Sequence, residues 1–115
     1  MNYRWGIFTA NLGPVIDSAQ QGNRTVIVVS DETYNTVMPV VTILPLAYLK
    51  ANRKIYPNET LLPAKTGDLA RDALVLAHQV RTISKKRLST PLGYVEDPTL
   101  QAAITETLKV HFNLP

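Results

Sequence analysis

The chain contains no cysteine, and His78 and His111 are the only histidines among its 115 residues. Without cysteine, disulfide bonds, thiolate nucleophiles and sulfur-ligated zinc sites are excluded, so packing alone must hold the fold together. The two histidines lie on separate predicted elements, and no acidic cluster at ligand spacing accompanies either of them. We therefore expect no metal ion and no other cofactor.

Long apolar runs and glycine-rich catalytic motifs are also missing. No stretch approaches the roughly 20 apolar residues of a membrane-spanning helix, and the N-terminal residues 1–5 lack the apolar centre of a signal peptide. Gly22 stands alone rather than in a phosphate-binding loop, and no G-x-S-x-G turn marks a hydrolytic triad. These absences favour a cytoplasmic protein without membrane contact, and they leave few kinds of catalysis open.

The chain does have the composition of a small globular protein. Apolar residues make up 45% of it and charged residues 18%, and β-branched residues are frequent relative to leucine. The length suits one hydrophobic core, and β-branched side chains favour strands. We expect a single domain over residues 1–115, built mainly from sheet.

Three strands are predicted in the first half of the chain. Residues 4–12 form the first, and residues 24–30 are so rich in β-branched side chains that both faces of the second must be covered. We therefore expect the second strand to be central. Residues 39–46 are predicted as its antiparallel neighbour, with Pro39 and Pro45 at the two ends because proline lacks an amide hydrogen.

The remaining segments predict shorter strands and turns. The polar residues 31–38 are predicted as a turn, and residues 55–62 contain enough alternation for one edge strand. Residues 73–77 and 80–83 are β-branched and apolar, which predicts one strand or two joined by a bend at His78-Gln79.

The C-terminal residues carry the signature of an amphipathic helix. Asp97 is a suitable N-cap, and Pro98 suits the first helical position. Apolar residues then recur every fourth position, at Leu100, Ile104, Leu108 and Phe112. Five or six short strands and one closing helix predict a mainly β fold with a C-terminal α-helix, arranged as a small and strongly bent barrel.

Positive charge is unevenly distributed along the chain, although the net charge of +3 is mild. One group of cations stands in a short stretch without acids and another follows the third predicted strand. The members are Arg81, Lys85, Lys86 and Arg87 in the first group, and Lys50, Arg53 and Lys54 in the second. Such groups are typical of surfaces that attract a polyanion, although solvated turns also carry them.

Arg24 stands where a polar turn meets the stiff second strand, so the fold can hold its guanidinium at a sheet edge. A guanidinium binds phosphate through two hydrogen bonds and neutralises charge that develops on phosphorus, and RNA carries its own nucleophile in the 2′-hydroxyl. Metal-free cleavage of RNA is therefore the chemistry that remains. The structural alternative is an ion pair of Arg24 with Asp17 or Asp31.

Several segments resemble the MazF/PemK/Kid family of toxin endoribonucleases. Residues 4–8, RWGIF, are similar to the family's first strand, R-G-[DE]-[IV], and Tyr34-Asn35 matches its Y-N. Residues 18–30, SAQQGNRTVIVVS, resemble G-S-E-Q-x-G-x-R-P followed by four aliphatic residues and a polar one. Residues 73–83, ALVLAHQVRTI, resemble [VI]-L-x-[DE]-Q-[VI]-[RK]-[ST]-[LI], and residues 84–88 continue this most specific match.

The resemblance spans nearly the whole chain and implies an SH3-like barrel of the CcdB/PemK type. It also implies a homodimer, a cognate acidic antitoxin, and metal-independent cleavage of single-stranded RNA, namely mRNA, that leaves a 2′,3′-cyclic phosphate. Arg24 matches the catalytic arginine of the family. The residues predicted to bind RNA are Gln20, Gln79, Arg81, Lys85, Lys86 and Arg87.

The chain departs from the family pattern at the catalytic site. Ala19 replaces the usual glutamate, and His78 replaces the usual acid before the glutamine. Where the family places a catalytic threonine or serine after the third strand, this chain offers Leu46 or Ala47. We expect Tyr48 to act as a substitute hydrogen-bond donor and the imidazole of His78 to move a proton.

Two other functions remain open at this point. A family member with a decayed site would bind RNA or antitoxin without cleaving, and the missing hydroxyl and Ala19 favour that alternative. A gyrase poison related to the CcdB toxins would share the fold, and its C-terminal residues 111–115 would then matter.

Overall fold

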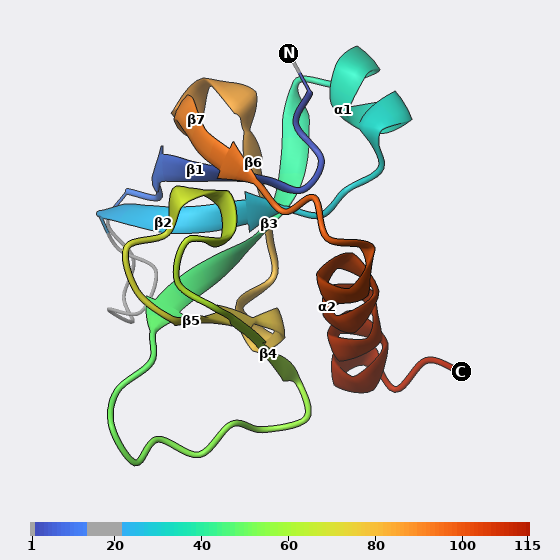
Figure 1. Cartoon of the computed structure of the whole chain (residues 1–115). Coiled ribbons are helices and arrows are strands. Elements are labelled where there is room, and N and C mark those ends of the chain that lie inside the picture. Colours follow the sequence, from blue (N-terminus) through green and yellow to red (C-terminus); the bar gives the residue numbers. More distant parts are fainter. Residues whose placement is uncertain (1, 14–21) are drawn as a thin grey trace.

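The computed structural model describes residues 2–13 and 22–115. These residues form a seven-stranded sheet, in which every neighbouring pair is antiparallel, and two α-helices (Figure 1). The strands are β1 (Gly6–Asn11), β2 (Asn23–Val28), β3 (Val40–Tyr48), β4 (Glu59–Leu62), β5 (Ala73–Leu76), β6 (Arg81–Ser84) and β7 (Leu88–Tyr94). The helices are α1 (Glu32–Val37) and α2 (Pro98–Phe112).

The sheet bends because its longest strand changes partner along its length. The strand order is β4-β5-β3-β2-β1-β7, and β6 pairs with β3 outside that path. Residues 40–43 of β3 pair with β6, whereas residues 46–48 pair with β5. The short turn η3 (Ala77–Gln79) carries the chain from β5 to β6. The predicted bend at His78-Gln79 is therefore confirmed, and it separates two strands.

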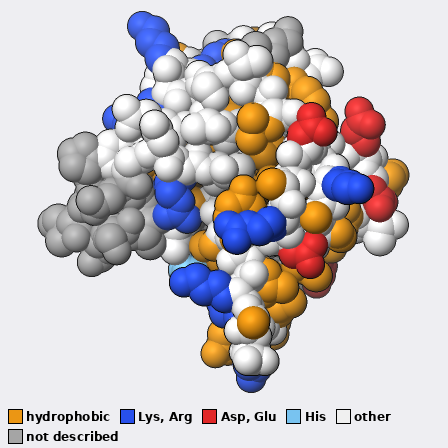
Figure 2. Space-filling view, turned by 60° about the vertical axis from the view of Figure 1, so that its left-hand side comes forward, with side chains coloured by type: hydrophobic (Ala, Val, Ile, Leu, Met, Phe, Trp, Pro, Cys, Tyr) orange, Lys and Arg blue, Asp and Glu red, His pale blue; other side chains and the backbone are white. Residues whose placement is uncertain are grey.

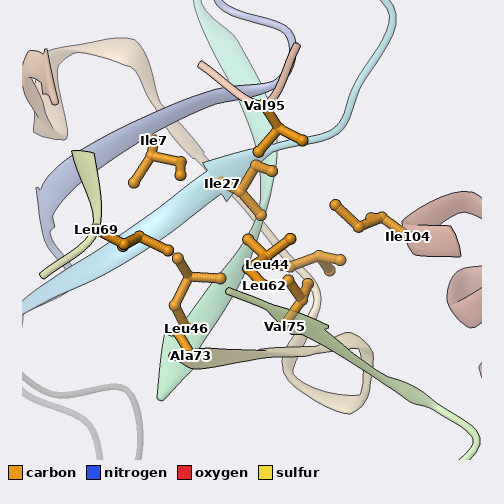
Figure 3. Close-up of a cluster of buried hydrophobic side chains, with 10 residues drawn as sticks. All are labelled: Ile7, Ile27, Leu44, Leu46, Leu62, Leu69, Ala73, Val75, Val95 and Ile104. Atoms are coloured by element: carbon orange, nitrogen blue, oxygen red, sulfur yellow. The ribbon is translucent and has the colours of Figure 1, made fainter. Parts of the chain in front are cut away.

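The main hydrophobic core lies between one face of the sheet and α2 (Figure 3). Ile104 projects from α2 into this cluster, and its side chain is 0% exposed. The buried members from the rest of the chain are Ile7, Ile27, Leu44, Leu46, Leu62, Leu69, Ala73, Val75 and Val95. Burial of this apolar surface is the main term that stabilises the fold.

A second apolar cluster covers the opposite face of the strands β1, β2 and β3. Side chains on a strand alternate between its faces, so Ile27 faces the main core while Val26 and Val28 face the second cluster. All three are 0% exposed. The prediction of a central strand that is covered on both faces is confirmed.

The prediction of a turn at residues 31–38 is wrong, because α1 occupies Glu32–Val37. The carboxylate of Asp31 accepts a hydrogen bond from the backbone amide of Thr33 at 3.0 Å and caps the helix. Asn35 is 1% exposed and binds the backbone oxygen of Ser30 through its amide. Local capping and one buried amide thus stabilise a helix that lacks an apolar stripe.

Two further details differ from the sequence-based expectations. Pro45 lies inside β3 rather than at its end, between the residues that pair with β6 and those that pair with β5, where an amide donor is not needed. Strand β7 was not predicted, since Pro91 and Gly93 disfavour a strand. It lies at the edge of the sheet, and its register with β1 shifts at two places, which such residues tolerate.

The C-terminal helix is confirmed from its cap onward. Asp97 accepts from the amide of Thr99 at 2.8 Å, and Pro98 opens α2. The apolar stripe ends earlier than predicted, however. Phe112 is 52% exposed and does not pack on the core, whereas the polar Thr107 is buried and bonds to Thr60 of β4.

Candidate functional site

Arg24 lies near the start of β2 and is tied to the neighbouring strand. Its Nη2 donates a hydrogen bond to the backbone oxygen of Leu46 in β3 at 3.2 Å. The side chain is partly buried, so the guanidinium is fixed by a backbone atom of a rigid strand. This arrangement preorganises a cation, which is the property an anion-stabilising site needs.

The structural alternative for Arg24 is not realised among the described residues. Asp31 lies 3.6 Å from the guanidinium of Arg4, and no described carboxylate forms an ion pair with Arg24. Asp17, the other predicted partner, and Gln20, a predicted RNA-binding residue, lie outside the described residues, as does Ala19.

The register between β2 and β3 identifies the residue that faces Arg24. Val26 pairs with Pro45 and Val28 with Ile43, and continuing this register by two residues brings Arg24 opposite Ala47. Strand alternation places both side chains on the face of the second apolar cluster, whereas Leu46 points into the main core. Of the two positions available for the missing hydroxyl, Ala47 is therefore the one beside Arg24.

Arg81 shares this face of the sheet. It pairs with Ile43, which in turn pairs with Val28, so the three side chains lie in one row across the strands. Gln79 precedes Arg81 in the turn η3. The structure thus brings Arg24 and Arg81 to one face, on two different strands around β3.

The three residues of the basic turn η4 (Lys85–Arg87) differ in their contacts. Lys85 donates from Nζ to the backbone oxygen of Asn35 at 2.7 Å and lies 5.0 Å from the ring centre of Tyr3, so it holds α1 in place. Arg87 donates to the backbone oxygen of Asn11 at 3.1 Å, next to the hairpin that leads to β2. Lys86 is exposed.

Tyr48 ends β3 on the opposite face from Arg24, because it alternates with Ala47. The guanidinium carbon of Arg71 lies 4.1 Å from the centre of its ring. The structure therefore pairs Tyr48 with Arg71, a cation–π contact that no sequence motif indicated. The contact fixes the ring of Tyr48, whose hydroxyl remains a predicted donor.

His78 belongs to a separate cleft of about 600 Å³. The cleft also contains His111 of α2 and the ion pair of Arg53 with Glu59. Strands β3 and β5 separate it from the strand that carries Arg24. The sequence predicted His78 as a catalytic helper of Arg24, and the structure places the two residues on different parts of the sheet.

The carboxylate of Glu59 is the most enclosed charge in this cleft, with a side chain that is 3% exposed. Arg53 donates to it from both Nη atoms, at 2.9 and 2.6 Å, and the amide of Tyr56 adds a bond at 2.9 Å. The hydrogen bonds from Arg53 lower the pKa of Glu59, against the opposing effect of burial, and the ion pair raises the pKa of Arg53.

Figure 2 shows how charged side chains are distributed over one face of the molecule. Lys and Arg side chains lie from the upper left through the centre to the bottom of this face, and the Asp and Glu side chains lie toward its right-hand side, where a Lys or Arg side chain stands among them. Within residues 2–13 and 22–115, no three His, Asp or Glu side chains gather closely enough to hold a metal ion. None of the helices in this part of the chain has the length and apolar character to cross a membrane.

Comparison with known proteins identifies the family. The family model of PemK-like, MazF-like toxins of type II toxin–antitoxin systems matches residues 3–112. The chain belongs to this family. A curated relative, endoribonuclease MazF9 of Mycobacterium tuberculosis (strain ATCC 25618 / H37Rv), is 34% identical over 119 residues, which cover 99% of this chain and 98% of the relative.

Solved structures of MazF-like toxins share the fold. An endoribonuclease from a mycobacterial species in complex with its cognate antitoxin superposes with a TM-score of 0.81 at 21% identity, covering 100% of this chain and 98% of that one. MazF from Deinococcus radiodurans superposes with a TM-score of 0.75 at 24% identity, covering 96% of each chain. The predicted fold class, a mainly β barrel of this type with a C-terminal helix, is confirmed.

Sequence reasoning missed two groups of polar residues in this MazF-like toxin. One is the stacked pair of Arg71 and Tyr48. The other is the cleft of Arg53, Glu59 and the two histidines, whose members are far apart in the chain. In the sequence, only the group of cations after the third strand indicated a binding surface near the cleft. That group does not include Glu59 or His111.

Proposed function

We propose that this MazF-like toxin is an endoribonuclease, an mRNA interferase, that cleaves single-stranded RNA with Arg24 at the scissile phosphate. The observation that carries the proposal is the bond from Arg24 Nη2 to the oxygen of Leu46, which fixes a guanidinium that no described carboxylate neutralises. Family membership and the relative named an endoribonuclease support the same activity.

In this mechanism Arg24 stabilises charge on the phosphate. The 2′-oxygen of the RNA attacks the neighbouring phosphorus, the bond from phosphorus to the 5′-oxygen breaks, and a 2′,3′-cyclic phosphate remains. The proton of the 2′-hydroxyl leaves to a base, and the departing 5′-oxygen takes up a proton. Negative charge grows on the non-bridging oxygens, where a preorganised guanidinium lowers the barrier. The protein needs no metal ion for these steps.

The substrate is single-stranded because in-line attack requires a splayed backbone that a duplex forbids. Arg81 lies on the face of Arg24, and Arg87 lies at the hairpin beside β2, so both are placed to bind the phosphates of a strand that crosses this face. Gln79, Lys86 and the loop residue Gln20 extend the proposed contact surface. Lys85 contributes only long-range attraction, since its Nζ binds Asn35.

The two catalytic helpers stay proposals with separate tests. If the hydroxyl of Tyr48 donates to the phosphate, Tyr48→Phe must slow cleavage, whereas a role of the ring alone leaves the rate unchanged. If His78 moves a proton, His78→Ala must remove one limb of the pH–rate profile. Each variant keeps Arg24 and its bond to Leu46 in place.

The proposed biological setting follows from the family. We place the toxin in the cytoplasm as a single domain over residues 1–115 that forms a homodimer. An acidic antitoxin binds and neutralises it, as the structure of a mycobacterial endoribonuclease with its cognate antitoxin illustrates for that protein. Light scattering of the purified toxin, alone and with its antitoxin, tests the dimer and the complex.

The decisive experiment is cleavage of a long RNA in EDTA by Arg24→Ala. We expect a loss of about a hundredfold or more, which is the usual effect of removing one preorganised donor to an oxyanion. Lys109→Ala, an exposed cation on α2, is the matched control and should retain the parental rate. Equal rates for the parent and Arg24→Ala would refute the proposed role.

Ala47 favours a second candidate function, because it lacks the hydroxyl that the family places there. A toxin that binds RNA or antitoxin without cleaving would show no products even at large enzyme excess, while its affinity for RNA persists. Inhibition of gyrase supercoiling, measured in the same preparation, would instead identify a CcdB-like poison.

A further inference from the structure

The cleft that holds His78 forms where three parts of the chain meet. The loop between β3 and β4 supplies Arg53, Tyr56 and Asn58, the turn η3 supplies His78, and the last turns of α2 supply His111. Its volume of about 600 Å³ is within the range of sites for small organic groups. Nothing in the proposed cleavage at Arg24 uses these walls, apart from His78.

The charges in the cleft largely cancel. Glu59 accepts hydrogen bonds from both Nη atoms of Arg53. The positive charge of Arg53 is therefore neutralised by a carboxylate whose side chain is only 3% exposed. The cleft is therefore suited to a neutral polar group rather than to a phosphate or a carboxylate.

The remaining groups match the chemistry of a nucleobase. Tyr56 presents a ring that is 50% exposed, with Arg53 and Lys54 within 5.7 and 5.2 Å of its centre. An exposed aromatic ring is a stacking surface for a base, and Lys54 beside it attracts the neighbouring phosphate outside the cleft. Asn58 binds His111 from Nδ2 to Nδ1 at 3.4 Å, so an amide and an imidazole lie together on the wall. Such groups read the edges of unpaired bases.

The position of the cleft suits a strand that also reaches Arg24. Glu59 pairs with Leu76 in β5, Leu74 of β5 pairs with Ala47, and Ala47 lies opposite Arg24. By strand alternation these side chains project from the face of the sheet that α2 does not cover, and His111 of α2 lines the cleft from the other face at the edge strand β4. Arg24 and Glu59 are separated by three strand spacings, roughly 14 Å across the sheet, and by two residues along β5, roughly 7 Å. A few nucleotides of extended RNA cover this distance.

The geometry points to a nucleobase-binding site in this cleft, which takes an unpaired base of the RNA a few nucleotides from the phosphate at Arg24. Tyr56 stacks on the base, and Asn58 with His111 binds its edge. The site rests on the proposed function for its substrate, but its affinity is independent of cleavage. Its consequence is a preference for RNA long enough to reach both places.

Binding of an oligonucleotide without 2′-hydroxyl groups tests the site, because such a strand cannot be cleaved. We expect Tyr56→Ala, Asn58→Ala and His111→Ala each to weaken the binding of a fluorescent single-stranded oligodeoxynucleotide, with about a tenfold loss for Tyr56→Ala. Tyr56→Phe keeps the ring and should bind like the parent. Tyr34→Ala removes another exposed tyrosine, 62% exposed on α1, and is the matched control.

Parental affinity in all three cleft variants would overturn the site. So would equal losses in the cleft variants and in Tyr34→Ala, or a loss of affinity for an acidic antitoxin peptide with unchanged affinity for the oligonucleotide, which would make the cleft a peptide site. If circular dichroism finds Tyr56→Ala unfolded, the half-buried His111 and Asn58 decide the outcome through their own variants.

The two proposals fail separately. Normal cleavage by Arg24→Ala combined with weak binding by Tyr56→Ala would refute Arg24 as the catalytic group and support the base site. Loss of cleavage in Arg24→Ala with unchanged binding in every cleft variant would support Arg24 as the catalytic group and refute the base site. Cleavage rates measured with RNAs of increasing length give an additional test. Tyr56→Ala should cleave more slowly than the parent only when the RNA is long enough to reach both Arg24 and the cleft.

Discussion

Arg24 of β2 donates a hydrogen bond from Nη2 to the backbone oxygen of Leu46 in β3, the residue before Ala47. This bond is 3.2 Å long, and the register between β2 and β3, continued by two residues past the pair of Val26 and Pro45, brings Arg24 opposite Ala47. The resemblance to the family implies a hydroxyl next to the catalytic arginine, and this register identifies the position where it is missing. The chain thus keeps the charge that stabilises the phosphate and lacks the neighbouring donor.

Ala47→Thr should therefore raise the cleavage rate. A hydroxyl restored beside Arg24 adds one donor to the developing charge, and removal of one such donor usually costs about a hundredfold. We expect an increase of about tenfold or more in single-turnover cleavage of RNA in EDTA. Ala47→Val has nearly the shape of threonine without the hydroxyl and should not be faster than the parent. Equal acceleration by valine and threonine would show that packing, not hydrogen bonding, is responsible.

Glu32→Gln should destabilise the fold at neutral pH. Burial opposes ionisation of Glu32, but hydrogen bonds from Arg4, Asn35 and Tyr3 outweigh it and lower its pKa below the ordinary 4.5. A lowered pKa contributes stability that is present above pH 4.5 and is lost as the pH falls through the folded value. We expect the variant to lose about 1 to 2 kcal/mol at pH 7 in urea unfolding.

The difference in the free energy of unfolding between Glu32→Gln and the parent should shrink as the pH falls through the lowered pKa of Glu32, because the parent then protonates Glu32 as well. Unfolding curves at pH 7, 5 and 3.5 check the sign. If the difference in the free energy of unfolding grew toward acid pH, it would contradict the assigned hydrogen bonds of Glu32.

Arg53→Met should lower the melting temperature at pH 7. The variant leaves the nearly enclosed carboxylate of Glu59 with the amide of Tyr56 but without its guanidinium partner, which is costly for a buried charge. Because the parental pKa of Glu59 is lowered, the pair stabilises the fold above the ordinary carboxyl pKa, and this advantage fades as the pH falls. Arg71→Met, which loses only a contact with Tyr48, serves as the comparison in the same thermal scans. A larger effect of Arg71→Met would be incompatible with this account.

Gly93→Ala should destabilise the fold through a direct clash. A Cβ at Gly93 would lie 2.6 Å from the backbone carbon and oxygen of Gly67, where two segments of main chain touch. We expect a loss of about 2 kcal/mol or more in the free energy of unfolding. Gly22→Ala is the comparison, because its φ of +71° is unfavourable for alanine but no described atom lies within 4 Å of the new Cβ. Its cost should stay near 1 kcal/mol. A similar loss in both variants would point to backbone strain alone.

The sequence predicted those elements whose signals are local. The cap formed by Asp97 and Pro98 fixed the start of α2, and the β-branched run around Ile27 identified β2 as a strand covered on both faces. Elements stabilised by distant partners were missed. Helix α1 depends on the buried amide of Asn35, and β7 depends on pairing with β1 despite Pro91.

The candidate site followed the same division. Arg24 was recognisable because a polar turn before a stiff strand is a local pattern. Its neighbour Ala47 was not, because two positions after the third strand were equivalent until the register with β2 was known. The surroundings of His78 were not recognisable for the same reason, since no local pattern tells that it shares a cleft with His111 of α2.

The sequence by itself determined the fold class, the chemistry that an isolated guanidinium offers and the absence of thiol groups, because these depend on residue types and on neighbours along the chain. Only the tertiary structure decided which side chains share a face of the sheet, which carboxylate neutralises which cation, and where a cleft opens. Those relations depend on strand register, and a shift of one residue would turn every side chain of a strand to the other face.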